Sequence, residues 1–150
     1  MKLFDTKMIE YRTDLDNWKD VVHAGVDILV KHKYAKKELA DAVFESTKQY
    51  GAYYVLERGL ALVHAKPGPY ALKPGTSTLL LDKYVKFNNQ DDKEAKIIIT
   101  LSAIDSTSHI SIIQEFGEYF TDENFKKQAL ECDSVKKFIE LLDNYKKGGK

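Results

Sequence analysis

Apolar side chains recur with helical spacing in two segments near the start of the chain, residues 17–33 and 36–50. In the first segment the i, i+3, i+4, i+7 positions are apolar or small, namely Trp18, Val21, Val22, Gly25, Val26, Leu29 and Val30. In the second segment one face holds Leu39, Val43 and Thr47. Asp16 is the expected N-cap of the first helix, and Gly51 is the expected end of the second.

Short apolar runs between turn residues predict four strands, at residues 53–57, 60–64, 76–82 and 96–102. The last run is the clearest because three consecutive isoleucines, Ile97 to Ile99, are typical of a strand buried on both faces. Two more amphipathic helices are expected at residues 108–120 and 134–145. The pattern predicts a single α/β domain over residues 1–150, with a mixed β-sheet flanked by helices on both faces.

The charge balance and the cysteine count argue against several classes of protein. The 150 residues include 23 basic and 23 acidic side chains; this balance argues against a nucleic-acid partner and against a polybasic membrane anchor. Cys132 is the single cysteine, so no intrachain disulfide can form and a reducing compartment is expected. The sequence shows no signal-peptide pattern and no apolar run long enough for a membrane span. A cytoplasmic location without membrane insertion is therefore expected.

The four histidines fall into two groups. His23 and His32 lie within the first predicted helix, where a structural or solvent-exposed role is expected. His64 instead ends one predicted strand and His109 lies beyond the end of another, and α/β proteins place their sites in loops at the carboxyl ends of strands. A Pro-Gly-Pro turn follows His64 and ends its strand. If the two strands are neighbours in the sheet, His64 and His109 converge at one edge.

A helix is expected to begin close to His109, with Ser106, Thr107 or Ser108 as its N-cap. The free N–H groups of its first turn would then form an anion site at the strand ends.

Three kinds of chemistry suit two histidines beside a helix N-terminus. A metal site is disfavoured, because the sequence has no His-x-x-x-His or Cys-x-x-Cys spacing. Nucleophilic hydrolysis is disfavoured too, because Gly-x-Ser-x-Gly is absent and the carboxylates flanking Cys132 raise the pKa of a thiol. A neutral histidine attacking an electrophilic phosphorus fits the setting, although the residues alone do not establish it.

Several stretches resemble a known family, the EIIA components of the sugar phosphotransferase system of the mannitol/fructose class. Residues 59–67, which contain His64, resemble the phosphorylation motif of that family. Residues 51–59 resemble the segment that leads into the motif, residues 85–92 resemble a family loop, and residues 97–109 resemble the strand that precedes the second histidine. Residues 18–30 look like the first helix of the ascorbate-type (Sga/Ula) members.

The resemblance implies a mixed sheet flanked by helices and a phosphotransferase with a phosphohistidine intermediate. The phosphocarrier protein HPr would donate a phosphoryl group to His64. His64 would pass it to a cysteine or histidine of the EIIB component, which is a cysteine in ascorbate-type systems. EIIB would phosphorylate a sugar that enters through EIIC. His109 would hydrogen-bond the phosphoryl group or the His64 ring. No cofactor and no metal are implied.

The chain departs from the family pattern of Pro-His-Ala/Gly-Arg around the acceptor histidine. Val63 replaces the proline, and Lys66 replaces the arginine, which keeps the charge but loses the bidentate fork for phosphate. Arg58 stands where proline is frequent and is expected to restore a guanidinium near the site. Lys66, Arg58 and Ser108 are therefore the expected phosphate-binding residues.

Two questions stay open in the sequence. Four apolar residues near His64 fit either a docking surface for partner proteins or ordinary core packing: Leu60, Leu62, Tyr70 and Leu72. The function also has two alternatives: a regulatory phosphorelay protein that is not coupled to transport, and a binding module whose histidines are structural. The sugar is not readable, with ascorbate favoured over fructose, mannitol or galactitol, and the oligomeric state is unknown.

Overall fold

A five-stranded sheet forms the centre of the protein, whose residues 2–149 the computed structural model describes, with side chains as far as Tyr145. In sheet order the strands are β1 (Ile9–Arg12), β4 (Gly75–Lys86), β5 (Glu94–Ser102), β3 (Gly59–Val63) and β2 (Val55–Glu57). The β1–β4 and β3–β5 pairs are parallel, whereas the β4–β5 and β2–β3 pairs are antiparallel. The mixed sheet that the sequence predicts is confirmed.

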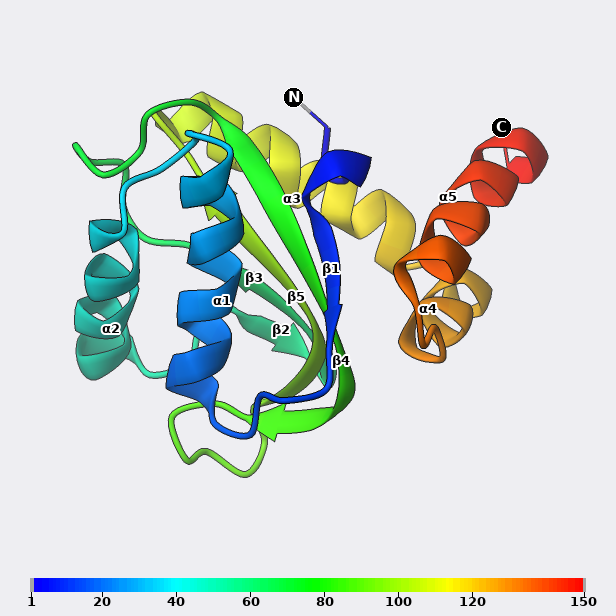
Figure 1. Cartoon of the computed structure of the whole chain (residues 1–150), viewed down its shortest axis with the longest axis horizontal. Helices are drawn as coiled ribbons and strands as arrows, with labels where there is room; N and C mark the ends of the chain where they lie inside the picture. Colours follow the sequence, from blue (N-terminus) through cyan, green and yellow to red (C-terminus); the bar gives the residue numbers. More distant parts are fainter. Residues whose placement is uncertain (1, 150) are drawn as a thin grey trace.

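Helices pack on both faces of this sheet (Figure 1). One face is covered by α1 (Trp18–Lys31) and α2 (Glu38–Tyr50), and the other is packed against α3 (Ser106–Phe120), α4 (Glu123–Leu130) and α5 (Val135–Gly149). A single 3₁₀ turn, η1 (Thr6–Met8), precedes β1. No helix among residues 2–149 is both long enough and apolar enough to cross a membrane.

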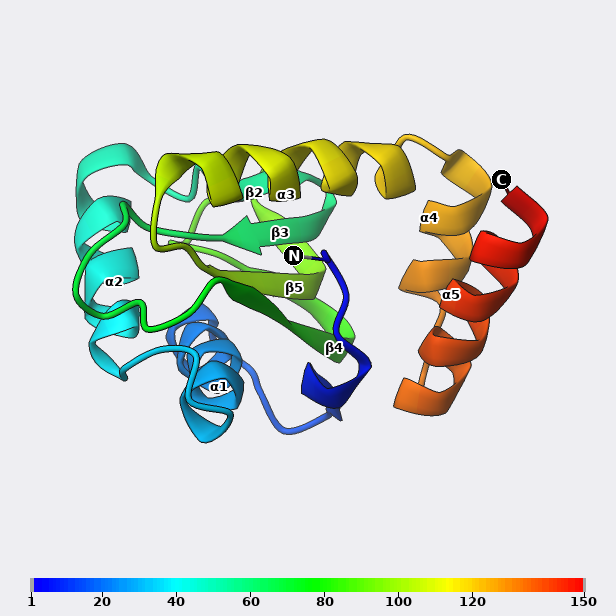
Figure 2. The same ribbon diagram turned by 90° about the horizontal axis from the view of Figure 1, so that it is seen from above.

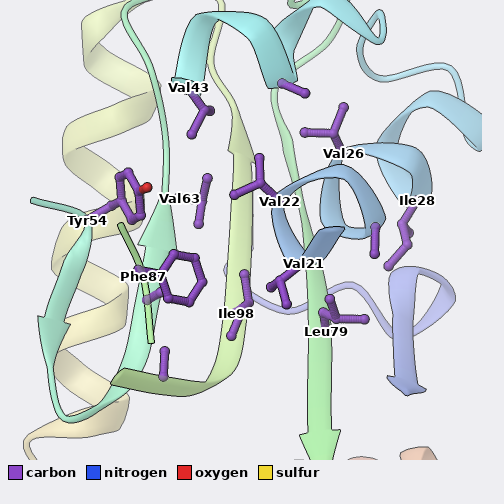
Figure 3. Close-up of a cluster of buried hydrophobic side chains, with 14 of the residues drawn as sticks. Val21, Val22, Val26, Ile28, Val43, Tyr54, Val63, Leu79, Phe87 and Ile98 are labelled. Atoms are coloured by element: carbon purple, nitrogen blue, oxygen red, sulfur yellow. The ribbon is translucent and has the colours of Figure 1, made fainter. Parts of the chain in front are cut away.

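Alternate residues of β3 enter two separate hydrophobic cores. Ala61 and Val63 belong to the core beneath α1 and α2 (Figure 3), whereas Leu60 and Leu62 belong to the core beneath the other helices. All four side chains are fully buried, so core packing is the correct interpretation of Leu60 and Leu62. His64 shares their parity, and continuation of the strand pattern directs it toward the α3 side of the sheet.

Two of the helix boundaries test the expected caps. The N-cap of α1 is Asn17, whose side chain accepts a hydrogen bond from the Asp20 N–H, and not Asp16. Asp16 pairs instead with Lys83. Gly51 ends α2 as expected, with a φ of 73° that a residue with a Cβ rarely adopts.

The sequence patterns missed β1 and α4. β1 has only four residues, and its parallel pairing with β4 comes from a distant part of the chain. In α4 the apolar face is reduced to Phe125 and Ala129, one turn apart, after an N-cap at Asp122. Neither segment is long enough for its periodicity to be clear.

A close approach of α1 to the sheet depends on Gly25. Its carbonyl accepts a hydrogen bond from Ser77 Oγ at 2.8 Å. Thr100 lies beneath the same turn, and its buried Oγ1 has no hydrogen-bond partner among the described residues. A Cβ at position 25 would overlap this oxygen. The buried helix therefore lies as close to β5 as a glycine allows.

We expect Gly25→Ala to lower the free energy of unfolding by about 1–3 kcal/mol, the usual cost of overpacking a core. Gly117→Ala in α3 is the matched control, because an added Cβ there meets nothing within 4 Å. The control should raise stability by about 0.5–1 kcal/mol through the helix propensity of alanine. Urea unfolding of the two variants measures both changes, and equal stabilities would contradict the proposed close packing.

Candidate functional site

The parallel pairing of β3 with β5 brings the two sequence-predicted histidines together. Val63, the last residue of β3, pairs with Thr100 near the end of β5, so the two strands end at the same edge. His64 follows β3, and His109 lies in the first turn of α3, which follows β5. In Figure 2 the arrow of β3 ends beside the start of α3. The ring centroids of His64 and His109 are 4.5 Å apart, which confirms the expected convergence.

One hydrogen bond fixes the protonation of the His64 ring. Its Nδ1 lies 2.6 Å from the backbone carbonyl of Leu62. A carbonyl can only accept, so Nδ1 carries the proton and Nε2 carries the lone pair. Nε2 has no hydrogen-bond partner among the described residues, and it is not one of the buried polar atoms that lack a partner. The free nitrogen is therefore both nucleophilic and in contact with solvent.

The surroundings of His64 favour the neutral imidazole. Burial lowers the pKa of the ring below its ordinary value; the hydrogen bond with Leu62 opposes this shift, and charge on His109 adds to it. The lone pair on Nε2 is accordingly available near neutral pH.

The His109 ring, which lies next to the His64 ring, has a nitrogen without a hydrogen-bond partner in the described part of the chain. Its Nε2 is buried and has no hydrogen-bond partner among the described residues. Buried polar atoms normally have a partner, and an exception calls for an explanation. A group attached to the neighbouring His64 ring would supply the partner that Nε2 lacks.

The N-terminus of α3 differs from the expected anion site. Its N-cap is Asp105, and not Ser106, Thr107 or Ser108. The Asp105 carboxylate accepts the Ser108 N–H at 2.8 Å. Hydrogen bonds from the Ser108 backbone and hydroxyl lower the pKa of Asp105, so the cap is negatively charged at neutral pH. The Ser108 amide is already occupied, and it is not free to bind a phosphate.

The two cations expected at the site lie at different ends of β3. Lys66 is exposed, two residues beyond His64, and its carbonyl accepts a hydrogen bond from the Tyr70 hydroxyl. Arg58 precedes β3, about 20 Å of extended chain from His64. Its guanidinium pairs with Glu94 at 3.3 Å and lies 4.2 Å from the centre of the Tyr84 ring. The structure thus corrects the expectation for Arg58, which does not reach the site.

Tyr53 is a site residue that sequence reasoning missed. It lies in the turn before β2, and its hydroxyl donates to the His64 carbonyl at 2.5 Å. Its ring meets the His64 ring edge-on, with centroids 5.1 Å apart. The sequence pattern predicts that Tyr53 lies in a strand. It gives no sign that the Tyr53 side chain bonds with the backbone of His64, eleven residues further along the chain.

Four exposed apolar side chains come from the two chain segments that hold His64 and His109. We call Leu72, Ile104, Ile110 and Ile113 the apolar rim: Leu72 comes from the loop after His64, and the isoleucines come from the segment that contains His109. Ile110 is 57% exposed and Ile113 is 42% exposed. Tyr70, expected to contribute to such a surface, is half-buried. Among residues 2–149, no three His, Cys, Asp or Glu side chains gather as a metal site.

Comparison with known proteins gives a consistent result. The family model described as "Phosphoenolpyruvate-dependent sugar phosphotransferase system, EIIA 2" matches residues 2–145. The "Ascorbate-specific PTS system EIIA component" of Shigella flexneri is 31% identical over 149 residues, covering 95% of this chain and 96% of that protein. Its counterpart in Escherichia coli K12 is 29% identical over 143 residues, covering 94% of this chain and 92% of that protein.

Solved structures share the fold. The solution structure of the mannitol-specific cryptic phosphotransferase enzyme IIA CmtB from Escherichia coli superposes with a TM-score of 0.80 at 30% identity, covering 95% of each chain. A chain in the Escherichia coli complex of enzyme IIAMtl with phosphorylated enzyme IIBMtl gives a TM-score of 0.79 at 21% identity, covering 96% of this chain and 99% of that one.

The His64 environment predicts an unusual titration. We expect a ¹H–¹⁵N spectrum of the imidazoles to show His64 with its proton on Nδ1, and with a titration midpoint below the ordinary histidine value because burial disfavours the charged ring. His109→Asn should raise this midpoint, since it removes a neighbouring positive charge. A midpoint at or above the ordinary value, or a proton on Nε2, would contradict the geometry.

Proposed function

The chain belongs to the EIIA 2 family of the phosphoenolpyruvate-dependent sugar phosphotransferase system, and from this premise we propose that His64 is the residue that carries the phosphoryl group. The observation that supports this most strongly is the free Nε2 of His64, held next to His109 while Nδ1 is bonded to the Leu62 carbonyl. A carrier of this kind needs a neutral nucleophile that solvent and a partner protein can reach.

The proposed reaction moves the phosphoryl group in two steps. The Nε2 lone pair of His64 attacks the phosphorus of the phosphohistidine on HPr. A new N–P bond forms on His64, the N–P bond on HPr breaks, and the HPr imidazole leaves with the electron pair. The proton of His64 stays on Nδ1, which donates to the Leu62 carbonyl throughout. In the second step a nucleophile on EIIB attacks the same phosphorus, and His64 is released as the neutral imidazole.

The phosphorylated state needs hydrogen-bond donors around the new oxygens. We assign this role to His109, whose buried Nε2 lacks a partner among the described residues and can donate when protonated. The Lys66 ammonium supplies a second positive charge from the loop that follows His64. The Ser108 amide takes no part in this proposal, because it donates to Asp105.

The proposed partners follow from the family and from the relatives. We propose HPr as the donor and EIIB as the acceptor. An enzyme IIA of the same fold is in complex with its phosphorylated enzyme IIB in the Escherichia coli IIAMtl–IIBMtl structure. EIIC participates indirectly, as the component through which the sugar enters. The ascorbate-specific relatives make ascorbate the favoured substrate of the whole system. Exchange with HPr and EIIB would take place in the cytoplasm.

The apolar rim is the surface on which these partners would dock. Interface cores are poor in charged residues and rich in apolar ones. Ile110 and Ile113 lie within one helical turn of His109, so a protein that reaches His64 Nε2 would cover them.

We expect phosphorylated HPr to transfer acid-labile, base-stable phosphate to the protein, and His64→Ala to abolish it, because the only proposed nucleophile is lost. His109→Gln should slow transfer in both directions on the order of a hundredfold, the effect of removing one donor from a charged intermediate. Rapid-quench measurements with HPr, and then with the cognate EIIB, give both rates.

Arg58→Ala and Lys66→Ala form a matched pair for the same assay, because each removes an exposed cation near one end of β3. Only Lys66→Ala should slow the transfer, since Arg58 bonds with Glu94 far from His64. Phosphate that persists on His64→Ala, or an equal loss in both lysine and arginine variants, would refute the assignment.

The docking surface makes a separate prediction. Ile113→Gln should raise the apparent KM for phosphorylated HPr about fivefold, equivalent to roughly 1 kcal/mol of lost interface contact, and should leave kcat nearly unchanged. Leu56→Gln is the control, because Leu56 is exposed to a similar extent, 46% against 42%, but lies on β2 and outside the rim. Matching KM values for the two variants would place the docking surface elsewhere.

A further inference from the structure

We propose that Tyr53 is a positioning residue for phosphoryl transfer, holding the main chain and the imidazole of His64 so that Nε2 stays free and directed outward. This inference rests on the proposed role of His64 and adds a residue that does not touch the phosphoryl group. It follows from three features: the place of Tyr53 in the sheet, its bond to the His64 carbonyl, and its ring contact.

The sheet places Tyr53 beside the end of β3. Strand β2 runs antiparallel to β3, with Val55 opposite Ala61, and the Leu62 N–H donates to the Tyr54 carbonyl at 2.9 Å. Residues that come earlier in β2 therefore lie opposite residues that come later in β3. Tyr53, two residues before Val55, comes alongside the point at which the chain leaves the sheet for His64.

The Tyr53 hydroxyl bonds with the backbone of the first residue beyond β3. His64 lies beyond the last residue of β3, so no neighbouring strand supplies a donor for its carbonyl. The Tyr53 hydroxyl donates to that carbonyl at 2.5 Å. Burial raises the pKa of Tyr53, which keeps the hydroxyl protonated and able to donate at neutral pH. The bond fixes the backbone bend that brings the His64 ring back over the Leu62 carbonyl.

The imidazole itself is also restrained by Tyr53. The two rings meet at 84° with centroids 5.1 Å apart, an edge-to-face contact of the favourable kind. Tyr53 is held in turn by Tyr54, whose ring lies 5.1 Å away and whose hydroxyl bonds with Thr47 at 2.9 Å. Its support is therefore a packed aromatic cluster anchored in α2.

Loss of the Tyr53 hydroxyl should free the ring without removing the nucleophile. The bend after Val63 would relax, the bond from Nδ1 to Leu62 would weaken, and the ring would spend part of its time with Nε2 protonated or turned away. A net hydrogen bond of this kind corresponds to a roughly three- to tenfold change in a rate constant. The effect should appear in kcat, because the apolar rim that meets the partner is intact.

The test compares Tyr53→Phe with Tyr50→Phe. Tyr53→Phe keeps the ring and removes only the hydroxyl. Tyr50→Phe removes a hydroxyl from the neighbouring ring, which meets Tyr53 edge-on with centroids 6.3 Å apart. Among the described residues, Tyr50 makes no hydrogen bond to His64. We expect a three- to tenfold lower single-turnover rate in Tyr53→Phe alone, with an unchanged KM for phosphorylated HPr.

A second measurement needs no phosphotransfer. In the unphosphorylated protein, the ¹⁵N signals of the His64 ring should move toward a mixture of tautomers in Tyr53→Phe and stay unchanged in Tyr50→Phe. Wild-type rates or unaltered His64 signals in Tyr53→Phe would overturn the role of Tyr53. Absence of His64 phosphorylation in the wild-type protein would instead overturn the proposed function, while the ring signals would still test the positioning by Tyr53.

Discussion

The parallel pairing of β3 with β5 is the constraint on which the site depends. Parallel strands present their carboxyl ends at one edge, so two residues separated by 45 positions in the sequence come within ring contact. An antiparallel pairing of the same strands would place His64 and His109 at opposite ends of the sheet. The isoleucine run of β5, buried on both faces, fixes that strand in the middle of the sheet and fixes the edge at which α3 begins.

The immediate environment of His64 suits a group that is received and then released. Strong donors around the phosphate would stabilise the phosphorylated protein and slow the second transfer, since tight ground-state binding raises the barrier that follows. The α3 amide at Ser108 is occupied by Asp105, and Arg58 lies at the other end of β3. Of the described residues considered for the phosphate, the His109 imidazole and the exposed Lys66 remain. This modest set is consistent with a carrier that exchanges phosphate in both directions.

The sequence predicts features that depend on local periodicity. The mixed sheet, the helices on both faces and the convergence of His64 with His109 all follow from apolar patterns and strand ends, and they are confirmed. Alternation along β3 also predicts the side of the sheet toward which His64 is directed.

Features that depend on long-range geometry are missed. β1 owes its existence to pairing with β4, and Tyr53 reaches His64 through a side-chain bond that leaves no periodic signal. The wrong expectation for Arg58 has the same origin. Arg58 and His64 are only six positions apart, but the extended strand β3 lies between them and holds them at its two ends. Neighbouring polar residues compete for the N-cap position of a helix. At α3 this residue is Asp105, and not one of the serines and threonine at 106–108 that the sequence predicts.

In the part of the chain that the structure describes, the His64 ring has one free nitrogen, Nε2, and this limits how partner proteins can bind. Because Nδ1 is bonded to the Leu62 carbonyl, donor and acceptor in the proposed reaction must both approach Nε2, and both must cover the same part of the surface. They therefore cannot bind at the same time, and one surface must fit two different proteins. Charge patterns that suit one partner tend to exclude another, whereas apolar contacts are less selective. The composition of the apolar rim, one leucine and three isoleucines, meets that requirement.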